Sequence, residues 1–254
     1  MTAKIISLDE YRQKLEGLET RTEWGDFQPI FILTKLGTAK EHKNYIAAKQ
    51  RSDVVAAYEL VKDIIPNDKI TELAALIADE SPIIVPVHAM EEFGTNKLPI
   101  AAAAYLGAKL NLEVWEHIIQ ANKPQRTDKG AFYRLSQYPF FDGLVEAGKT
   151  YIIFDDTLST GGTFASLKGY IENKGGHVLL GVALTGHEPA AKISITQKMY
   201  NSLIQKHGDE LNEWWKVEIG FGLDKLTQGE AGHLLKAPSI DEIRSRIAKS
   251  RPET

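Results

Sequence analysis

The strongest constraint on how this chain folds is one run in which an apolar strand, a glycine turn, a helix and a second apolar strand follow one another. Tyr151–Phe154 is continuously apolar, as expected for a strand that is buried on both faces. A helical pattern that includes Phe164 and Ile171 follows, and Val178–Leu184 is again apolar. Strands joined through a helix run parallel, so the sequence predicts an α/β fold with a mostly parallel, twisted sheet flanked by helices.

Composition excludes several classes of protein. Of the 254 residues, 43% are hydrophobic and 25% are charged, which is typical of a globular domain. There is no cysteine, so disulfides, thiolate metal sites and cysteine nucleophiles are excluded. No apolar run approaches the ~18 residues of a membrane helix, and Met1–Leu15 lacks the apolar core of a signal peptide, so we expect a cytoplasmic protein without membrane contact. A net charge of -4 argues against binding to free DNA or RNA.

Periodicity predicts further elements before that run. A helix with a Ser52 cap has apolar residues at i, i+3, i+4 and i+7. Ile83–Val87 is predicted as a buried strand, a helix is predicted to start near Asn96, and Leu112–Ile119 is a second strand candidate. Gln120–Phe141 has no period and is predicted as a loop of roughly 20 residues, a length that usually indicates a functional segment.

The two ends of the chain are expected to pack on a central core as a helical hood or accessory part. Residues 80–185 are the predicted core, and residues 1–79 and 186–254 are the accessory segments of the same structural unit. Ser239-x-x-Glu242 is predicted as a capping box for the last helix, and Thr227-x-x-Glu230 as a helix cap and no more. Trp214 and Trp215, which belong to the segment 186–254, are expected in the core of the accessory part.

Two acidic residues and a glycine turn lie between the first strand and the helix of the central run. Asp155 and Asp156 end the strand, and Thr157–Thr163 contains hydroxyls and two adjacent glycines. The backbone N–H groups of such a turn, with the positive end of the helix dipole behind them, suit a phosphate. A phosphate near two carboxylates needs a neutral group between them, and sugar hydroxyls can donate to the carboxylates. The residues therefore predict a ribose 5-phosphate site.

The stretch Tyr151–Thr163 resembles the phosphoribosyl pyrophosphate signature of type I phosphoribosyltransferases, and the resemblance extends over residues 80–185. It implies a type I phosphoribosyltransferase-like fold. It also implies that Asp155 and Asp156 contact the ribose 2′- and 3′-hydroxyls, act as the catalytic pair and hold Mg²⁺. The 5-phosphate would contact the residues of the turn: Thr157, Leu158, Ser159, Thr160, Gly161, Gly162 and Thr163.

In that family, the loop after the first core strand holds pyrophosphate. Residues 86–99 take this place here, and they resemble the Gly-x-Asn version of competence-type phosphoribosyltransferases more than the commoner basic-Gly pattern. The resemblance implies four substrate ligands in this loop: His88, Gly94, Asn96 and Lys97. A purely structural role for Asn96, as the cap of the next helix, is the alternative.

The resemblance implies Mg²⁺-dependent transfer of ribose 5-phosphate between phosphoribosyl pyrophosphate and a nitrogenous base, with release of pyrophosphate. Gln120–Phe141 would be the flexible loop that closes over the site, with Arg126 as a substrate ligand among four cationic candidates: Lys123, Arg126, Lys129 and Arg134. Ser159 stands where 6-oxopurine members have a carboxylate general base, which disfavours a hypoxanthine- or guanine-type reaction.

Family members are often dimers, so a homodimer is also a possible state of this protein. The alternative function is a non-catalytic regulator or partner-binding protein of the same fold that senses phosphoribosyl pyrophosphate or a nucleotide.

Two further patterns are expected to have no chemical role. Gly143–Thr150 matches the ATP-binding P-loop letter for letter, but a strand follows it where a P-loop needs a helix, so a turn into that strand is predicted. The seven histidines show no i, i+3 or i+4 pair, which excludes a local zinc motif. His187, which follows the second apolar strand, is expected to have a surface or capping role, and lining the site is the alternative.

Overall fold

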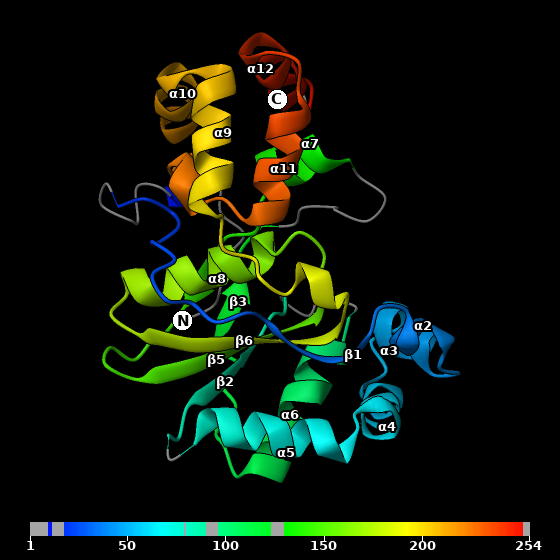
Figure 1. The fold of residues 1–254 in the computed structure, drawn as a ribbon. Coiled ribbons are helices and arrows are strands. Elements are labelled where there is room, and N and C mark those ends of the chain that lie inside the picture. The colour runs from blue at the N-terminus through cyan, green and yellow to red at the C-terminus, as the bar shows by residue number, and fades with distance from the viewer. Residues whose placement is uncertain (1–9, 12–17, 79, 90–95, 123–129, 251–254) are drawn as a thin grey trace.

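A four-stranded parallel sheet lies at the centre of the molecule (Figure 1). The computed structural model describes residues 10–11, 18–78, 80–89, 96–122 and 130–250. The strand order is β1-β6-β5-β2, in which the strands are β1 (Phe31–Lys35), β6 (His177–Gly186), β5 (Thr150–Thr157) and β2 (Ile83–Pro86). All three pairings are parallel, so the predicted α/β fold with a parallel sheet is confirmed. A separate antiparallel pair joins β3 (Ile118–Gln120) to β4 (Phe141–Gly143).

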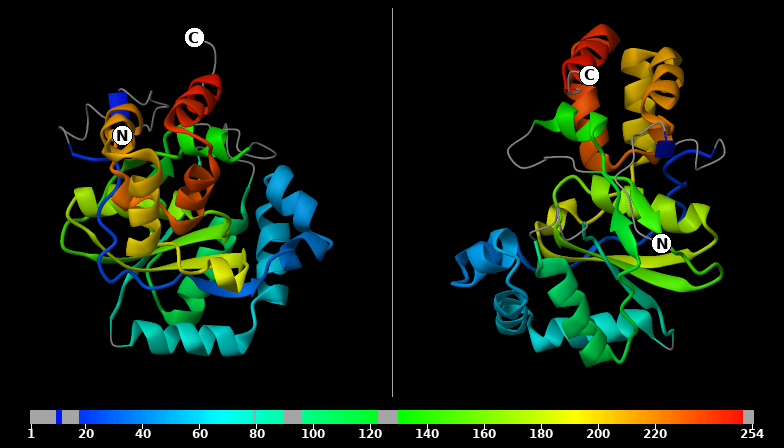
Figure 2. Two further views of the ribbon diagram at one scale, coloured as in Figure 1. Left: turned by 45° about the horizontal axis from the view of Figure 1, so that its top comes forward. Right: turned by 180° about the vertical axis from the view of Figure 1, so that it is seen from behind.

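Helices cover both faces of this sheet (Figures 1 and 2). On one side lie α2 (Thr38–Glu41), α3 (Tyr45–Gln50), α4 (Val54–Ile64), α5 (Asn67–Ile77) and α6 (Leu98–Leu110). On the other side lies α8 (Gly162–Asn173), and beyond it stands a helical unit of α7 (Ala131–Ser136), α9 (Gln197–His207), α10 (Asp209–Ile219), α11 (Gln228–Lys236) and α12 (Ile240–Lys249). The short turns η1 (Glu188–Ala190) and η2 (Leu223–Lys225) precede α9 and α11. None of the helices in the described part of the chain has the length and apolarity that a bilayer crossing requires.

Strand β5 is apolar at successive positions because the sheet is buried on both faces. Tyr151 and Ile153 belong to the core shared with α8 and the C-terminal helices, whereas Ile152 and Phe154 belong to the core shared with α4, α5 and α6. Successive side chains of a strand point to opposite faces, so each of these positions needs an apolar residue. All four side chains are at most 1% exposed.

The sheet takes one strand from outside the predicted core of residues 80–185. β1 pairs with β6, and its side chains also divide between the two cores, with Ile32 on the side of α8 and Leu33 on the side of α4 to α6. The predicted boundary at residue 80 therefore separates a strand from its own sheet. The apolar run Ile30–Leu33 is a signal of the same kind as that of β2, so β1 could have been predicted from the sequence.

Leu112–Ile119 was expected as a second strand, and most of it is not one. Val114 forms a single bridge to Ile84 on the outer side of β2, and the chain then turns away, so that only Ile118–Gln120 pairs, with β4. Glu116 separates the two pairings and interrupts the apolar pattern. The apolar residues of this range therefore pair with two different strands, β2 and β4.

The cap of α4 differs from the prediction by one residue. Asp53, not Ser52, is the N-cap, and its side chain accepts the N–H of Ala56 at 2.9 Å. Ser52 has a positive φ of 56° and lies in the turn before the cap. Both residue types suit an N-cap, so the sequence alone does not distinguish adjacent candidates.

The segment Gln120–Phe141 contains structure that its lack of period did not predict. Its first and last residues pair in β3 and β4, and α7 lies between them. α7 has six residues and packs against α11 and α12, so its stability comes from tertiary contacts rather than from a local pattern. The expected cations Lys123, Arg126 and Lys129 lie outside the described residues.

Several local expectations are confirmed. Trp215 is fully buried among the C-terminal helices. Ser239 accepts the N–H of Glu242 at 3.2 Å and caps α12, which is half of the predicted capping box, because the Glu242 side chain accepts Arg246 Nε at 2.7 Å instead. The P-loop-like stretch is a turn, in which Gly148 has a φ of 77° and Lys149 is followed directly by β5.

A buried ion pair joins the two accessory segments. Arg21 donates to both carboxylate oxygens of Glu230, at 2.6 and 2.9 Å, and the two residues are 2% and 3% exposed. Glu230 also accepts the N–H of Thr227 at 2.9 Å and completes a capping box at the start of α11. The cap is as predicted, but the expectation of no further role is wrong, because the same carboxylate holds Arg21. The guanidinium of Arg21 lies 4.2 Å from the ring centre of Phe221.

Arg21→Met is expected to lower the free energy of unfolding by about 3–5 kcal/mol, because it leaves the Glu230 carboxylate buried without its cation. Arg244→Met is the matched control: Arg244 pairs with exposed Glu210 at 2.7 Å, and loss of such a pair costs about 0–1 kcal/mol. Urea denaturation followed by circular dichroism measures both. Equal losses in the two variants would contradict a structural role specific to the buried pair.

Candidate functional site

The candidate site lies where the central strand β5 ends and α8 begins. Asp155, Asp156 and Thr157 are the last residues of β5, and α8 starts at Gly162 after a four-residue turn. The N–H of Leu158 donates to Thr185 O at 2.8 Å and holds this turn against β6. The first N–H groups of a helix have no partner inside it, and the dipole is positive at that end, so the turn can receive an anion. Ligands of open α/β sheets bind at this carboxyl edge.

The two carboxylates have different surroundings. Asp155 is half-buried and accepts the N–H of Asp156 at 2.8 Å. Burial, and after it the negative charge of Asp156, raise the pKa of the Asp155 carboxyl well above its usual range. Asp156 is 8% exposed, and its main-chain oxygen accepts the Thr185 hydroxyl at 3.1 Å.

Lys49 contacts the acidic pair and was not found from the sequence. It lies on α3, and its ammonium forms a salt bridge with Asp156 Oδ2. Burial opposes the charge of Lys49, but the attraction and hydrogen bond of Asp156 outweigh it and raise the pKa of the ammonium. Lys49 stands in a short helical stretch without a motif, more than a hundred residues before the acids, so only the fold brings them together.

Although the N-cap residue of α6 is Lys97, Asn96 joins the start of α6 to the acidic pair. Its Oδ1 accepts the N–H of Leu98 at 3.2 Å at the start of α6, and its Nδ2 donates to Asp156 Oδ2 at 3.1 Å. The N–H of Lys97 donates to Ala48 O at 3.0 Å, which joins this loop to α3. The candidate pyrophosphate loop, α3 and the acidic pair therefore meet at one carboxylate.

The other predicted ligands differ in their surroundings, and two of them are not described by the structure. His88 contacts Glu116 O through Nε2 at 3.0 Å, and burial lowers its pKa. Gly94 and Arg126 lie outside the described residues. In the turn, Leu158 is 2% exposed, so its side chain belongs to the core and only its main chain remains for a ligand. Ser159 is exposed on the turn.

The two glycines of the turn are packed against the C-terminal part of the chain. Gly161 has a φ of 82°, and a Cβ there would lie 2.7 Å from Ile193 Cγ2. A Cβ on Gly162 would lie 2.5 Å from Glu230 Oε1, and the Gly162 carbonyl accepts Arg21 at 3.5 Å. The glycines are therefore required by packing as well as by the turn.

The acidic pair is engaged in part by donors from the protein. Asp156 Oδ2 already accepts Lys49 and Asn96. No group of three or more His, Cys, Asp or Glu side chains that could hold a metal occurs within the described ranges. Mg²⁺ in proteins is often held by one or two carboxylates together with substrate phosphates and water. A divalent ion at this site would accordingly depend on a bound phosphate ligand.

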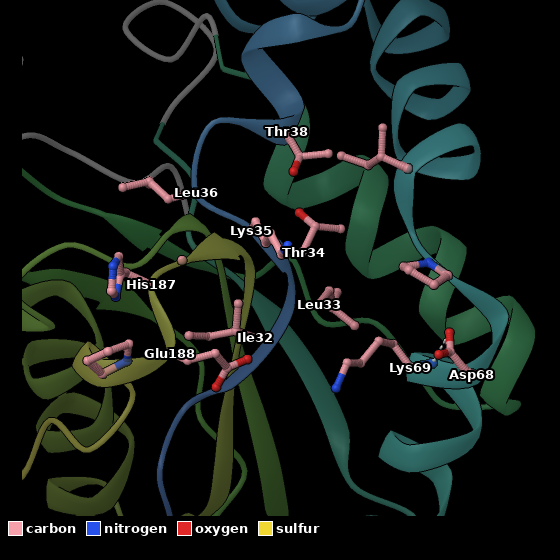
Figure 3. Close-up of a pocket in the computed structure, with 14 residues that line it drawn as sticks. Ile32, Leu33, Thr34, Lys35, Leu36, Thr38, Asp68, Lys69, His187 and Glu188 are labelled. Carbon is pink, nitrogen blue, oxygen red and sulfur yellow. Dashed lines mark hydrogen bonds between the residues drawn. The ribbon is translucent and has the colours of Figure 1, made fainter.

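A separate hollow of about 740 Å³ lies at the outer edge of β1 (Figure 3). Ile32 to Leu36 run through it, with Asp68 and Lys69 of α5 on one side and His187 and Glu188 after β6 on the other. Among the predicted substrate ligands that the structure describes, none lines it. His187 thus lines this hollow and follows β6, the strand next to β5.

No protein-family model matches this chain. Proteins similar in sequence include protein TraN of Escherichia coli, 46% identical over 233 residues, and an uncharacterized protein of Haemophilus influenzae, 42% identical over 169 residues. The matches span 92% and 66% of this chain but only 52% and 38% of those proteins. The chain therefore spans about half, or less, of the relatives it matches.

Similar solved structures include adenine phosphoribosyltransferase from Rhodothermus marinus, with a TM-score of 0.32 and 17% identity over 48% of this chain and 70% of that chain. A second adenine phosphoribosyltransferase has a TM-score of 0.33 and 17% identity over 52% of this chain and 76% of that chain. UMP synthase of Leishmania donovani has a TM-score of 0.29 and 17% identity over 72% of this chain and 34% of that chain. Scores of this size describe partial overlap, so the fold of this chain is defined by its own strand order and pairing.

Gly161→Ala is expected to cost about 1–3 kcal/mol more in the free energy of unfolding than Gly148→Ala. Both glycines have a positive φ, but an added Cβ meets Ile193 only at Gly161 and nothing within 4 Å at Gly148. Urea titrations of the two variants isolate the contact with Ile193. Identical costs would mean that Ile193 moves aside without loss.

Asp155→Asn is expected to raise the free energy of unfolding at neutral pH. The raised pKa means that the folded state disfavours the Asp155 anion, so this carboxylate destabilises the fold above its folded pKa. The gain should shrink as the pH falls through the folded pKa toward the unfolded value, because the native carboxyl is then protonated in both states. Denaturation at several pH values measures this, with exposed Asp26→Asn as the control. A gain that is independent of pH would contradict the assignment.

Proposed function

We propose that this chain binds phosphoribosyl pyrophosphate at the end of β5 and transfers its ribose 5-phosphate to a nitrogenous base. The observation that supports this most is the order of groups along one strand, turn and helix. Two carboxylates, Asp155 and Asp156, end a central strand, and the glycine turn leads directly into the start of α8. Carboxylates beside a helix N-terminus suit a ligand with hydroxyls next to a phosphate, which ribose 5-phosphate has.

In this proposal the N–H groups of residues 159–163 hold the 5-phosphate, and the carboxylates accept the ribose hydroxyls. The bond between ribose C1 and the pyrophosphate oxygen breaks, a bond from a base nitrogen to C1 forms, and the proton of that nitrogen is released. Asp155 and Asp156 stabilise the positive charge that develops on the ribose. Mg²⁺, bound together with the diphosphate, would neutralise the leaving group. Asn96 and Lys97, at the start of α6, would contact that group.

A non-catalytic sensor of phosphoribosyl pyrophosphate or a nucleotide is the second candidate. One contact favours it: Asp156 Oδ2 already accepts Lys49 and Asn96, so a ribose hydroxyl must displace a protein group to reach that oxygen. Binding would then be coupled to a rearrangement of α3. The two candidates differ in whether pyrophosphate is released in the presence of a base.

Phosphoribosyl pyrophosphate with MgCl₂ is expected to bind the wild type in calorimetric titration and not to bind Asp155→Asn/Asp156→Asn. The exposed pair Asp26→Asn/Asp209→Asn removes the same charge and should leave the affinity unchanged. With an accepted base, Asp156→Asn should cut pyrophosphate release at least about tenfold, because a carboxylate that stabilises the transition state is lost. Binding without release for every base tried would favour the sensor. No binding by folded wild type would refute both candidates.

A further inference from the structure

The ammonium of Lys49 lies where three parts of the candidate site meet. It contacts Asp156 Oδ2, the oxygen to which Asn96 also donates, and α3 is joined to the loop of residues 96–97 by the hydrogen bond from Lys97 N–H to Ala48 O. The Lys49 side chain is 31% exposed, whereas that of Asp156 is 10% exposed. The cation therefore contacts a buried carboxylate, is partly exposed itself, and lies on a helix that is joined to residues 96–97.

Under the proposed function, a ribose hydroxyl that bound Asp156 Oδ2 would compete with Lys49 for that oxygen. A carboxylate oxygen has two lone pairs, and Asp156 Oδ2 already accepts two donors. Asn96 is fixed by its second bond, to the N–H of Leu98 at the start of α6. Lys49 carries its ammonium on a flexible four-carbon stem, which can change its partner without moving the backbone. Of the two donors, Lys49 can therefore move away more readily when a sugar hydroxyl binds.

We propose that Lys49 is a diphosphate ligand, which exchanges Asp156 for the diphosphate of phosphoribosyl pyrophosphate when that substrate binds. This inference rests on the proposed function. A diphosphate offers several negatively charged oxygens, and a lysine ammonium binds phosphate as a point charge. The exchange releases Asp156 for the ribose and brings a cation to the leaving group in one movement. In this way Lys49, a residue of the N-terminal segment, takes part in binding the diphosphate leaving group.

A purely structural Lys49 would behave differently. If the salt bridge only held α3 against the sheet, its loss would disturb the carboxylates and weaken every ligand of the site to a similar extent. If Lys49 binds the diphosphate, its loss weakens ligands that contain a diphosphate and spares those that do not. Inorganic pyrophosphate and ribose 5-phosphate separate the two cases, because each is one half of the substrate.

The test is calorimetric titration of the full chain with three probes: inorganic pyrophosphate, ribose 5-phosphate and phosphoribosyl pyrophosphate, each with MgCl₂. Lys49→Met should weaken pyrophosphate and phosphoribosyl pyrophosphate by about tenfold or more, and should leave ribose 5-phosphate unchanged or tighter. Lys49→Arg keeps the charge and should recover part of the loss. Lys43→Met, on the exposed surface between α2 and α3, removes the same charge and should change none of the three affinities. Thermal unfolding confirms that each variant is folded.

Pyrophosphate binding that is unchanged in Lys49→Met would overturn the inference, and so would an equal loss for all three probes. Wild type that binds ribose 5-phosphate but not pyrophosphate would also overturn it, while the ribose-phosphate site would stand. Wild type that binds none of the probes would refute the proposed function, and the inference would fall with it.

Discussion

A nearly buried carboxylate, Asp156, organises the end of the sheet. A charge out of contact with water is costly unless paired and hydrogen-bonded, and here a lysine, an amide and a threonine hydroxyl surround this one residue. These groups come from α3, from the loop before α6 and from β6. The charge of the carboxylate is compensated from α3 and from the loop before α6, and the Thr185 hydroxyl, which donates to the main-chain oxygen of Asp156, joins the same residue to β6.

The sequence predicted the parts of this arrangement whose signals are contiguous. β5, the turn and α8 follow one another, and the strand is recognisable because each of its faces is buried. Lys49 and Arg21 were missed because neither has a local pattern, and their partners lie far along the chain. α7 was missed for a related reason: it is short, and its stability comes from tertiary contacts rather than from periodicity. β1 is different, because its apolar run Ile30–Leu33 is a signal that the sequence does contain.

The glycine turn shows why a motif alone does not settle chemistry. Gly161 and Gly162 are needed so that Ile193 and Glu230 can pack closely. A chain that had lost every contact with phosphate would still require both glycines, whereas packing alone gives no reason for two acids to stand together at the end of β5. The carboxylates, and the lysine that faces them, are therefore the more informative part of the motif.

Arg21 connects the helical unit to the turn. Its guanidinium binds the first turn of α11 through Glu230, reaches the carbonyl of Gly162 and lies against Phe221. Because Arg21 contacts both Glu230 and Gly162 directly, a movement of the first turn of α11 would also move the start of α8. A displacement of the C-terminal helices would therefore reach the turn at the end of β5 through direct side-chain contacts.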